Sequence, residues 1–278
     1  MEIKVLNKII EEIENLGLDQ LLTGCKKYDS IFKVIPQMVV ALNGLNLEFF
    51  RVRDIDDNVN EGTPCSFSYK PESLKPAINR LNLEGESTFY GALFPHISMK
   101  ESNVECGKEF YISKWTIDGS ANLILYRLFD SQELVHNKKA SEAIDYFSSV
   151  KQDGSIDLLF AIADNILSIK EGTNKYNLTA LYANYLRRNR TPELKNEDGE
   201  KGKIKIDGFL YRSVKSNNPD ELNLALFPDV IDKWAKLNYV LKGSIDDAYE
   251  IITGVKGIFN GEEIKWSDSI EQFRLKEL

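Results

Sequence analysis

The order of strand-like and helix-like segments constrains this chain more than any other feature of its sequence. Residues 87–129 contain three strand patterns, STFYGALF, FYISKWTI and ANLILYRLF, and the turn at residues 118–120 predicts a hairpin between the last two. Residues 140–188 then follow helical periodicity in three successive segments, and strand patterns return after residue 203. Because the strands come in runs and do not alternate with helices, the pattern predicts an α+β fold with a mainly antiparallel β core, N-terminal helices and a helical insertion.

The amino-terminal part of the chain predicts helices. Residues 2–22 carry an apolar stripe at spacings of three and four, formed by Ile3, Leu6, Ile9, Ile10, Ile13 and Leu16. Residues 29–44 predict a second helix, with Pro36 as a kink or break and Gly44 as its end. The aromatic and β-branched run LEFFRVR at residues 47–53 then predicts a strand.

These patterns predict how the chain is divided. We expect residues 1–45 to form a helical segment packed on the core, because its apolar stripe must be buried. We expect residues 46–278 to form one domain with a helical insert at about residues 131–190. The polar stretch at residues 189–203 predicts a surface loop.

Composition excludes several classes of protein. With 278 residues, 42% of them hydrophobic, the chain is long enough for a buried core, yet no apolar run approaches the roughly 18 residues of a membrane helix. The first residues lack the apolar core of a signal peptide, which favours a cytoplasmic protein. A net charge of −8 argues against general nucleic-acid binding, which depends on lysine and arginine.

The scarcity of cysteine and histidine limits the available chemistry. The three cysteines form no CxxC pair, and the two histidines, His96 and His136, exclude most multi-histidine metal sites and most Ser-His-Asp arrangements. Neither a GxGxxG nor a GxxxxGK[ST] motif supports a Rossmann unit or a P-loop. We therefore expect no metal, and catalysis must use other side chains.

Three separated segments resemble the RES domain family, which is named for its arginine, glutamate and serine. The segment FFRVR places Arg51 at the early arginine of the family. The segment NRLN, followed by a glycine and FYGAL, resembles the family pattern G-R-[WF]-N, G, Y-L-A and contains Arg80, Asn82 and Tyr90. Glu101 follows this tyrosine at the spacing expected of the family glutamate.

The third segment places the serine. DGFLYRSVKSNNPDELNLALF resembles the family pattern D-G-[IL]-x-Y-x-S with its following N-L-x-L-F strand, and Ser213 stands at the serine. The sequence departs from the family at Asn79, where glycine is usual, and at Leu81, which replaces an aromatic residue. The resemblance covers residues 47 to 228.

The resemblance implies a fold similar to ADP-ribosyltransferases and a reaction that consumes NAD as a substrate, with no other cofactor. Breaking the nicotinamide–ribose bond leaves an oxocarbenium-like ribose, which a carboxylate at Glu101 would stabilise. In this interpretation Tyr90 stacks on nicotinamide and Ser213 hydrogen-bonds the amide or the ribose. The dinucleotide would be bound by Arg51, Arg80 and Asn82, with the two guanidinium groups on the pyrophosphate.

The resemblance leaves several alternatives open. The leading hypothesis is an NAD glycohydrolase or phosphorylase that acts as a toxin or defence effector, with an antitoxin, a regulatory protein or a second copy as its partner. The alternatives are an ADP-ribosyltransferase that modifies a protein and an inactive binding module. Arg51 and Arg53 lie close together in one strand, and the sequence leaves open which of them faces the site.

Overall fold

The computed structural model describes residues 3–33, 35, 37–56, 59–129, 160, 164, 176–195 and 201–278. The chain divides into two compact units, each assembled from three separate segments. We call the first the helical unit; it comprises Met1–Val40, Pro71–Ser87 and Ile124–Arg212. We call the second the sheet unit; it comprises Ala41–Lys70, Thr88–Leu123 and Ser213–Leu278. Nothing in the structure tests the predicted boundary at residue 45, which stays a prediction.

The amino-terminal helix predicted over residues 2–22 is two helices. Helix α1 (Ile3–Glu14) is followed by α2 (Leu18–Thr23), and Gly17 between them adopts an extended conformation with φ −71° and ψ 159°. The side chain of Gln20 accepts a hydrogen bond from the backbone nitrogen of Gly17 at 3.0 Å, which caps α2. The apolar spacing predicted helical structure correctly, but it did not show the break.

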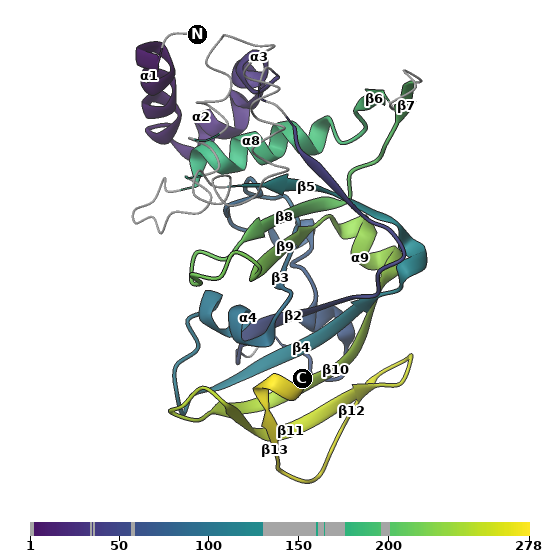
Figure 1. Cartoon of the computed structure of the whole chain (residues 1–278). Coiled ribbons are helices and arrows are strands. Elements are labelled where there is room, and N and C mark those ends of the chain that lie inside the picture. Colours follow the sequence, from purple (N-terminus) through teal and green to yellow (C-terminus); the bar gives the residue numbers. More distant parts are fainter. Residues whose placement is uncertain are drawn as a thin grey trace. The chain divides into compact units, whose positions relative to one another are not determined.

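Helix α8 (Asn177–Arg188) confirms the third helical segment predicted within residues 140–188 and packs against α1 (Figure 1). The side chain of Asn177 donates hydrogen bonds to the carbonyls of Ile13, at 3.2 Å, and Leu16, at 2.9 Å. These carbonyls belong to the end of α1, where intrahelical partners are missing. The first two predicted segments, residues 140–150 and 156–169, lie outside the described residues except for residues 160 and 164.

The second predicted helix, over residues 29–44, is wrong beyond its first turn. Helix α3 spans only Asp29–Phe32, and Val39–Leu42 form strand β1. Two adjacent valines with β-branched side chains favour an extended backbone there. Pro36, the predicted kink, lies outside the described residues.

The helical unit contains the parallel strand pair of the fold. Strand β5 (Leu123–Leu128) runs parallel to β8 (Gly208–Arg212), with Leu125 opposite Gly208, and β1 borders the other edge of β5. The predicted loop at residues 189–203 contains a short antiparallel pair, β6 (Glu193–Lys195) and β7 (Lys201–Lys203). The segment predicted as a surface loop thus contains regular strand pairing that the sequence analysis did not predict.

The sheet unit is antiparallel throughout its described pairs, as the sequence predicted. Its strands follow the order β9-β3-β2-β4-β10-β11-β12, and β13 pairs with β11 (Figure 1). Their bounds are β2 Leu47–Asp54, β3 Phe89–Ala92, β4 Glu109–Ile117, β9 Leu222–Leu226, β10 Ala235–Ile245, β11 Ile251–Phe259, β12 Ile264–Trp266 and β13 Glu271–Arg274. The molecule is thus a mixed α and β protein with a mostly antiparallel sheet.

The predicted hairpin between β4 and β5 is wrong, although its turn is present. Strand β4 pairs with β2 and β10, whereas β5 pairs with β8. The turn forms the short helix η4 (Gly119–Ala121), in which the Asp118 carboxylate accepts a hydrogen bond from the backbone nitrogen of Ser120 at 3.0 Å. A β-carbon on Gly119 would lie 2.8 Å from the Gly44 carbonyl carbon, so only glycine allows this close approach.

Aromatic and aliphatic side chains form the core of the sheet unit. The ring of Phe89 lies edge-on to Phe49, with centroids 5.4 Å apart, and to Trp115, at 5.5 Å. The described α-helices of this unit are α4 (Pro95–Glu101) and α9 (Pro228–Trp234), and each begins with a proline after an extended phenylalanine. Other short helices among the described residues are η1 (Cys25–Tyr28), η2 (Pro64–Phe67), η3 (Glu72–Leu74) and η5 (Leu275–Glu277).

Within the described part of the chain, no helix is both long enough and apolar enough to cross a bilayer.

Candidate functional site

Glu101 ends helix α4 and is held in place by two side chains of the sheet unit. Its Oε1 atom accepts hydrogen bonds from the Ser213 hydroxyl, at 2.7 Å, and from the Asn223 amide, at 2.8 Å. The helix is anchored beneath the carboxylate by Ile97 and Met99, which are both fully buried. Among the described residues no donor reaches Oε2. The carboxylate therefore has a fixed orientation and one oxygen available for a ligand.

Ser213 follows strand β8 directly in the sequence and is completely buried. Its backbone nitrogen donates to the Glu221 carbonyl at 2.9 Å, which fixes the start of the following loop. Its hydroxyl oxygen accepts from the backbone nitrogen of Lys215 at 3.1 Å. Because a carboxylate can only accept, the hydroxyl proton points to Glu101. The structure thus brings two of the predicted residues, Glu101 and Ser213, into direct contact.

Asn223 is the site residue that the sequence analysis missed. It lies in strand β9 opposite Ala92 of β3 and is only 4% exposed. A buried amide needs hydrogen-bond partners, and Glu101 provides one of them. A signal was available, because Asn223 is the asparagine that opens the N-L-x-L-F pattern of the third resembling segment, but the sequence analysis gave it no role.

Arg51 lies in the middle of β2 and contacts the next strand of the sheet unit, β3. Its Nη1 atom donates to the backbone carbonyl of Tyr90 at 2.7 Å, and its guanidinium lies 5.2 Å from the centre of the Phe89 ring. Its Nε atom is buried and has no hydrogen-bond partner among the described residues. The residue as a whole has intermediate exposure.

The charge of Arg51 is not balanced by a carboxylate in the described part of the chain. Burial lowers the pKa of this guanidinium to about 10, and the nearby positive charge of Arg53 contributes in the same direction. Arg51 still carries its charge at neutral pH. A buried cation without an acidic partner is costly, and an anionic ligand would relieve that cost.

Arg53 has different partners from Arg51, although residues two apart in a strand share one face. Its guanidinium donates to the backbone carbonyl of Ser66 and lies 3.9 Å from the Asp56 carboxylate. Arg53 thus stabilises the segment after β2 that contains Asp56 and Ser66. Of the two arginines that the sequence could not separate, Arg51 is the one whose charge lacks a carboxylate partner among the described residues.

Tyr90 is partly buried in β3, where it lies opposite Ala225 of β9. Its backbone carbonyl is the acceptor for Arg51. The proposed stacking of its ring on a ligand stays a prediction.

Arg80 and Asn82 belong to the helical unit, whereas the other four predicted residues belong to the sheet unit. The Arg80 guanidinium lies 5.8 Å from the centre of the Tyr176 ring. Asn82 is buried and donates to the carbonyls of Ala77, at 2.9 Å, and Leu83, at 2.8 Å. These bonds give Asn82 a clear role in shaping its own loop, and ligand binding by either residue stays a prediction.

His96 at the start of α4 forms a hydrogen bond that the sequence did not predict. Its Nε2 atom lies 2.8 Å from the Glu221 carboxylate, whose other oxygen accepts from the Ser216 hydroxyl. Burial tends to raise the pKa of Glu221, but the hydrogen bonds from Ser216 and His96 outweigh it and lower that pKa. Glu221 also holds Ser213 through its backbone carbonyl.

The lowered pKa of Glu221 predicts a pH-dependent contribution to stability. A carboxyl group whose pKa is lower in the folded state stabilises the protein above its ordinary pKa of about 4.3, and this contribution disappears as the pH falls through the folded value. We expect Glu221→Gln to lower the free energy of unfolding at neutral pH, with the difference from the wild type shrinking in acid. Urea titrations over a series of pH values measure this. A difference that does not vary with pH would show that the ionised carboxylate is not responsible.

Within the described residues, no group of histidine, cysteine, aspartate and glutamate side chains is arranged to hold a metal ion.

Comparisons with known proteins identify no relative: neither a family model, nor a curated protein, nor a solved structure matches the chain.

Proposed function

We propose that this protein is an NAD-degrading enzyme that cleaves the bond between nicotinamide and ribose. The observation that carries the proposal is the Glu101 carboxylate, oriented through one oxygen by Ser213 and Asn223 while its second oxygen has no donor among the described residues. The proposal includes an ADP-ribosyltransferase-like fold and membership of the RES domain family, with NAD as substrate and no additional cofactor.

Cleavage of the nicotinamide–ribose bond requires a group that a fixed carboxylate can provide. Nicotinamide leaves as a neutral molecule from a cationic ring, so the reaction needs no general acid, but positive charge develops on the ribose. Oε2 of Glu101 would accept a hydrogen bond from a ribose hydroxyl and place negative charge beside this cation. Because Ser213 and Asn223 already hold the other oxygen, the group needs little reorganisation as the reaction proceeds.

Arg51 supports the proposal independently. A dinucleotide carries a pyrophosphate, and a guanidinium binds such oxygens through paired N–H groups. The buried Nε of Arg51 and its lack of a described carboxylate partner fit a residue whose counter-charge arrives with the substrate. In this proposal Tyr90 contacts the nicotinamide ring, and Arg80 and Asn82 assist the dinucleotide.

NAD carrying a label on its adenylate half tests the reaction and identifies the acceptor. We expect wild-type protein to release nicotinamide and to leave the label in a small molecule: ADP-ribose when water attacks, or its phosphate ester when inorganic phosphate attacks. Label on a macromolecule would identify a protein ADP-ribosyltransferase instead. If the NAD is unchanged, the protein would be a binding module without catalytic activity. If NAD is consumed, growth arrest on expression would support a toxin role that an antitoxin restrains.

Arg51→Lys tests the role of the guanidinium. Lysine keeps the positive charge but lacks the planar fork, so we expect KM for NAD to rise by roughly tenfold while kcat changes less. Arg53→Lys is the matched control, because Arg53 lies on the same strand and is held by Ser66 and Asp56. Steady-state kinetics of both variants make the comparison. Equal effects of the two substitutions would assign Arg51 a structural role.

A further inference from the structure

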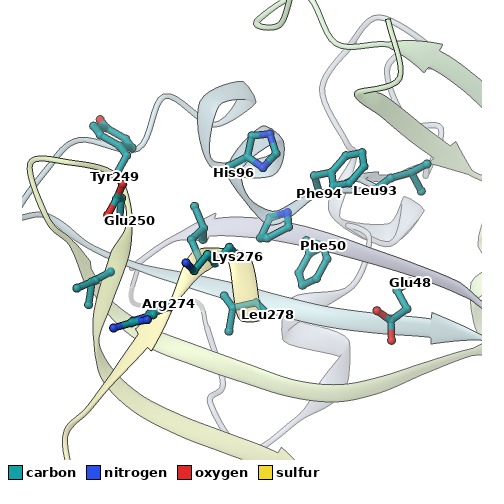
Figure 2. Close-up of a pocket in the computed structure, with 13 residues that line it drawn as sticks. Glu48, Phe50, Leu93, Phe94, His96, Tyr249, Glu250, Arg274, Lys276 and Leu278 are labelled. Atoms are coloured by element: carbon teal, nitrogen blue, oxygen red, sulfur yellow. The ribbon is translucent and has the colours of Figure 1, made fainter. Parts of the chain in front are cut away.

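A second candidate site in the sheet unit is a cavity of about 830 Å³ (Figure 2). Its walls come from α4, β11, β13, η5 and β2, together with the two residues that follow β3. Cavities of roughly 300–1,000 Å³ are typical of small-molecule sites. Its lining does not include Glu101, Ser213, Asn223 or Arg51, so the cavity is separate from the carboxylate cluster described above.

One part of the lining is apolar. Phe50, Pro95 and Leu275 are buried beneath the cavity, and Figure 2 shows Phe50 close to Leu278. Phe94 and Tyr249 also line it, and they are 40% and 42% exposed. Large aromatic side chains that remain exposed around a concave surface indicate a binding site for an apolar body.

The other part of the lining carries charge, with Arg274 and Lys276 on the carboxyl-terminal segment. Lys276 has no carboxylate partner among the described residues. Among the described residues, the carboxylate partner of Arg274 is Glu277, at 3.7 Å, and both side chains are more than 60% exposed, so this pair is weak. Both cations are therefore available to a ligand.

The lining also contains the acidic side chains of Glu48 and Glu250. Glu48 is engaged by the Lys114 ammonium at 3.0 Å, which leaves Glu250 as the lining carboxylate with no cation partner in the described part of the chain. His96 adds a third basic group, although its imidazole is already bound to Glu221. Leu278 also lines the cavity, and its backbone oxygen accepts from Lys114 at 2.7 Å. Among the described side chains, Arg274 and Lys276 thus face a single lining carboxylate without a cation partner, Glu250, which favours an anionic group on the ligand.

We propose that this cavity binds a small organic anion with an apolar or aromatic body. The apolar body would lie against Phe50 and Phe94, and the anionic group would lie at Lys276 and Arg274. The ligand class is defined by this combination: an apolar molecule without the anion loses the charge-assisted bonds, and an inorganic anion loses the apolar contact.

Two fluorescent probes that differ only in the anionic group test the proposal. Anilinonaphthalene sulfonate has an aromatic body and a sulfonate, and phenylnaphthylamine is the same body without the sulfonate. We expect saturable binding of one sulfonate probe per chain. Lys276→Glu is expected to weaken it by roughly tenfold or more, with little effect on the neutral probe. Because Lys276 is exposed, this substitution leaves the core undisturbed.

Lys265→Glu is the matched control, since Lys265 lies on β12, is 68% exposed and does not line the cavity. Arg274→Glu should weaken the sulfonate probe in the same way as Lys276→Glu. The proposal is overturned if the sulfonate probe does not saturate, or if Lys265→Glu weakens it as much as Lys276→Glu does. Glu101→Gln should leave probe binding unchanged, so a failure of this proposal is distinguishable from a failure of the proposed NAD chemistry.

Discussion

Replacing Glu101 by glutamine is expected to reduce NAD cleavage by about a hundredfold or more while the protein stays folded. Glutamine keeps the size of the side chain, and its amide oxygen can still accept hydrogen bonds from Ser213 and Asn223, which now hold Oε1. What it removes is the negative charge beside the ribose cation. The loss should therefore fall on kcat more than on KM, because the charge acts mainly in the transition state.

The control for this substitution is Glu105→Gln. Glu105 follows α4 in the chain, is 65% exposed and pairs only with exposed Lys108 in the described structure. Nicotinamide release by this variant should equal that of the wild type. Thermal unfolding of both variants shows whether the fold is preserved. If Glu101→Gln retained near-wild-type turnover, the assignment of the catalytic carboxylate would be wrong.

Leu21→Ala is expected to destabilise the helical unit by about 3–5 kcal/mol, the usual cost of truncating a buried leucine. Leu21 in α2 is completely buried, whereas its neighbour Leu22 is 40% exposed. Leu22→Ala is thus the same substitution at the next position of the same helix, and we expect it to cost about 1 kcal/mol or less. The pair separates burial from helix propensity, since alanine favours the helix equally at both positions.

Urea unfolding followed by far-UV circular dichroism measures both variants. A cost for Leu22→Ala equal to that for Leu21→Ala would show that the amino-terminal helices are not packed as the structure has them. The measurement also bears on residues 1–45, which the sequence predicts to be packed on the core. If Leu21→Ala lowers stability and NAD turnover together at physiological temperature, the amino-terminal helices support the catalytic part of the chain.

The fold was predictable where periodicity is local and strong. The aromatic run of β2 and the helical spacing of α8 identified these elements correctly, because side-chain pattern alone determines which face is buried. The prediction failed at Val39–Leu42, which was assigned to a helix although its β-branched pair favours a strand. It also failed for the partner of β4, since sheet neighbours far apart in sequence leave no local signal.

The candidate site was predictable only in part. The resemblance identified Glu101 and Ser213, which the structure places in hydrogen-bond contact. It included Asn223 in the N-L-x-L-F pattern but gave this residue no role, because its burial and its hydrogen bond to Glu101 become visible only in the folded structure. The absence of a carboxylate beside Arg51 among the described residues likewise depends on three-dimensional packing, which determines whether a carboxylate reaches a guanidinium.

The most direct measurement of the proposed function follows NAD and nicotinamide by proton NMR in one sample of purified wild-type protein. The nicotinamide ring protons shift when the glycosidic bond breaks, so the spectrum reports that single bond. With the wild type we expect free nicotinamide to accumulate in proportion to the NAD consumed. In an identical sample that contains the Glu101→Gln variant, we expect NAD to remain intact. Intact NAD in the presence of folded wild-type protein, or equal turnover by both proteins, would contradict the assignment of this carboxylate to NAD cleavage.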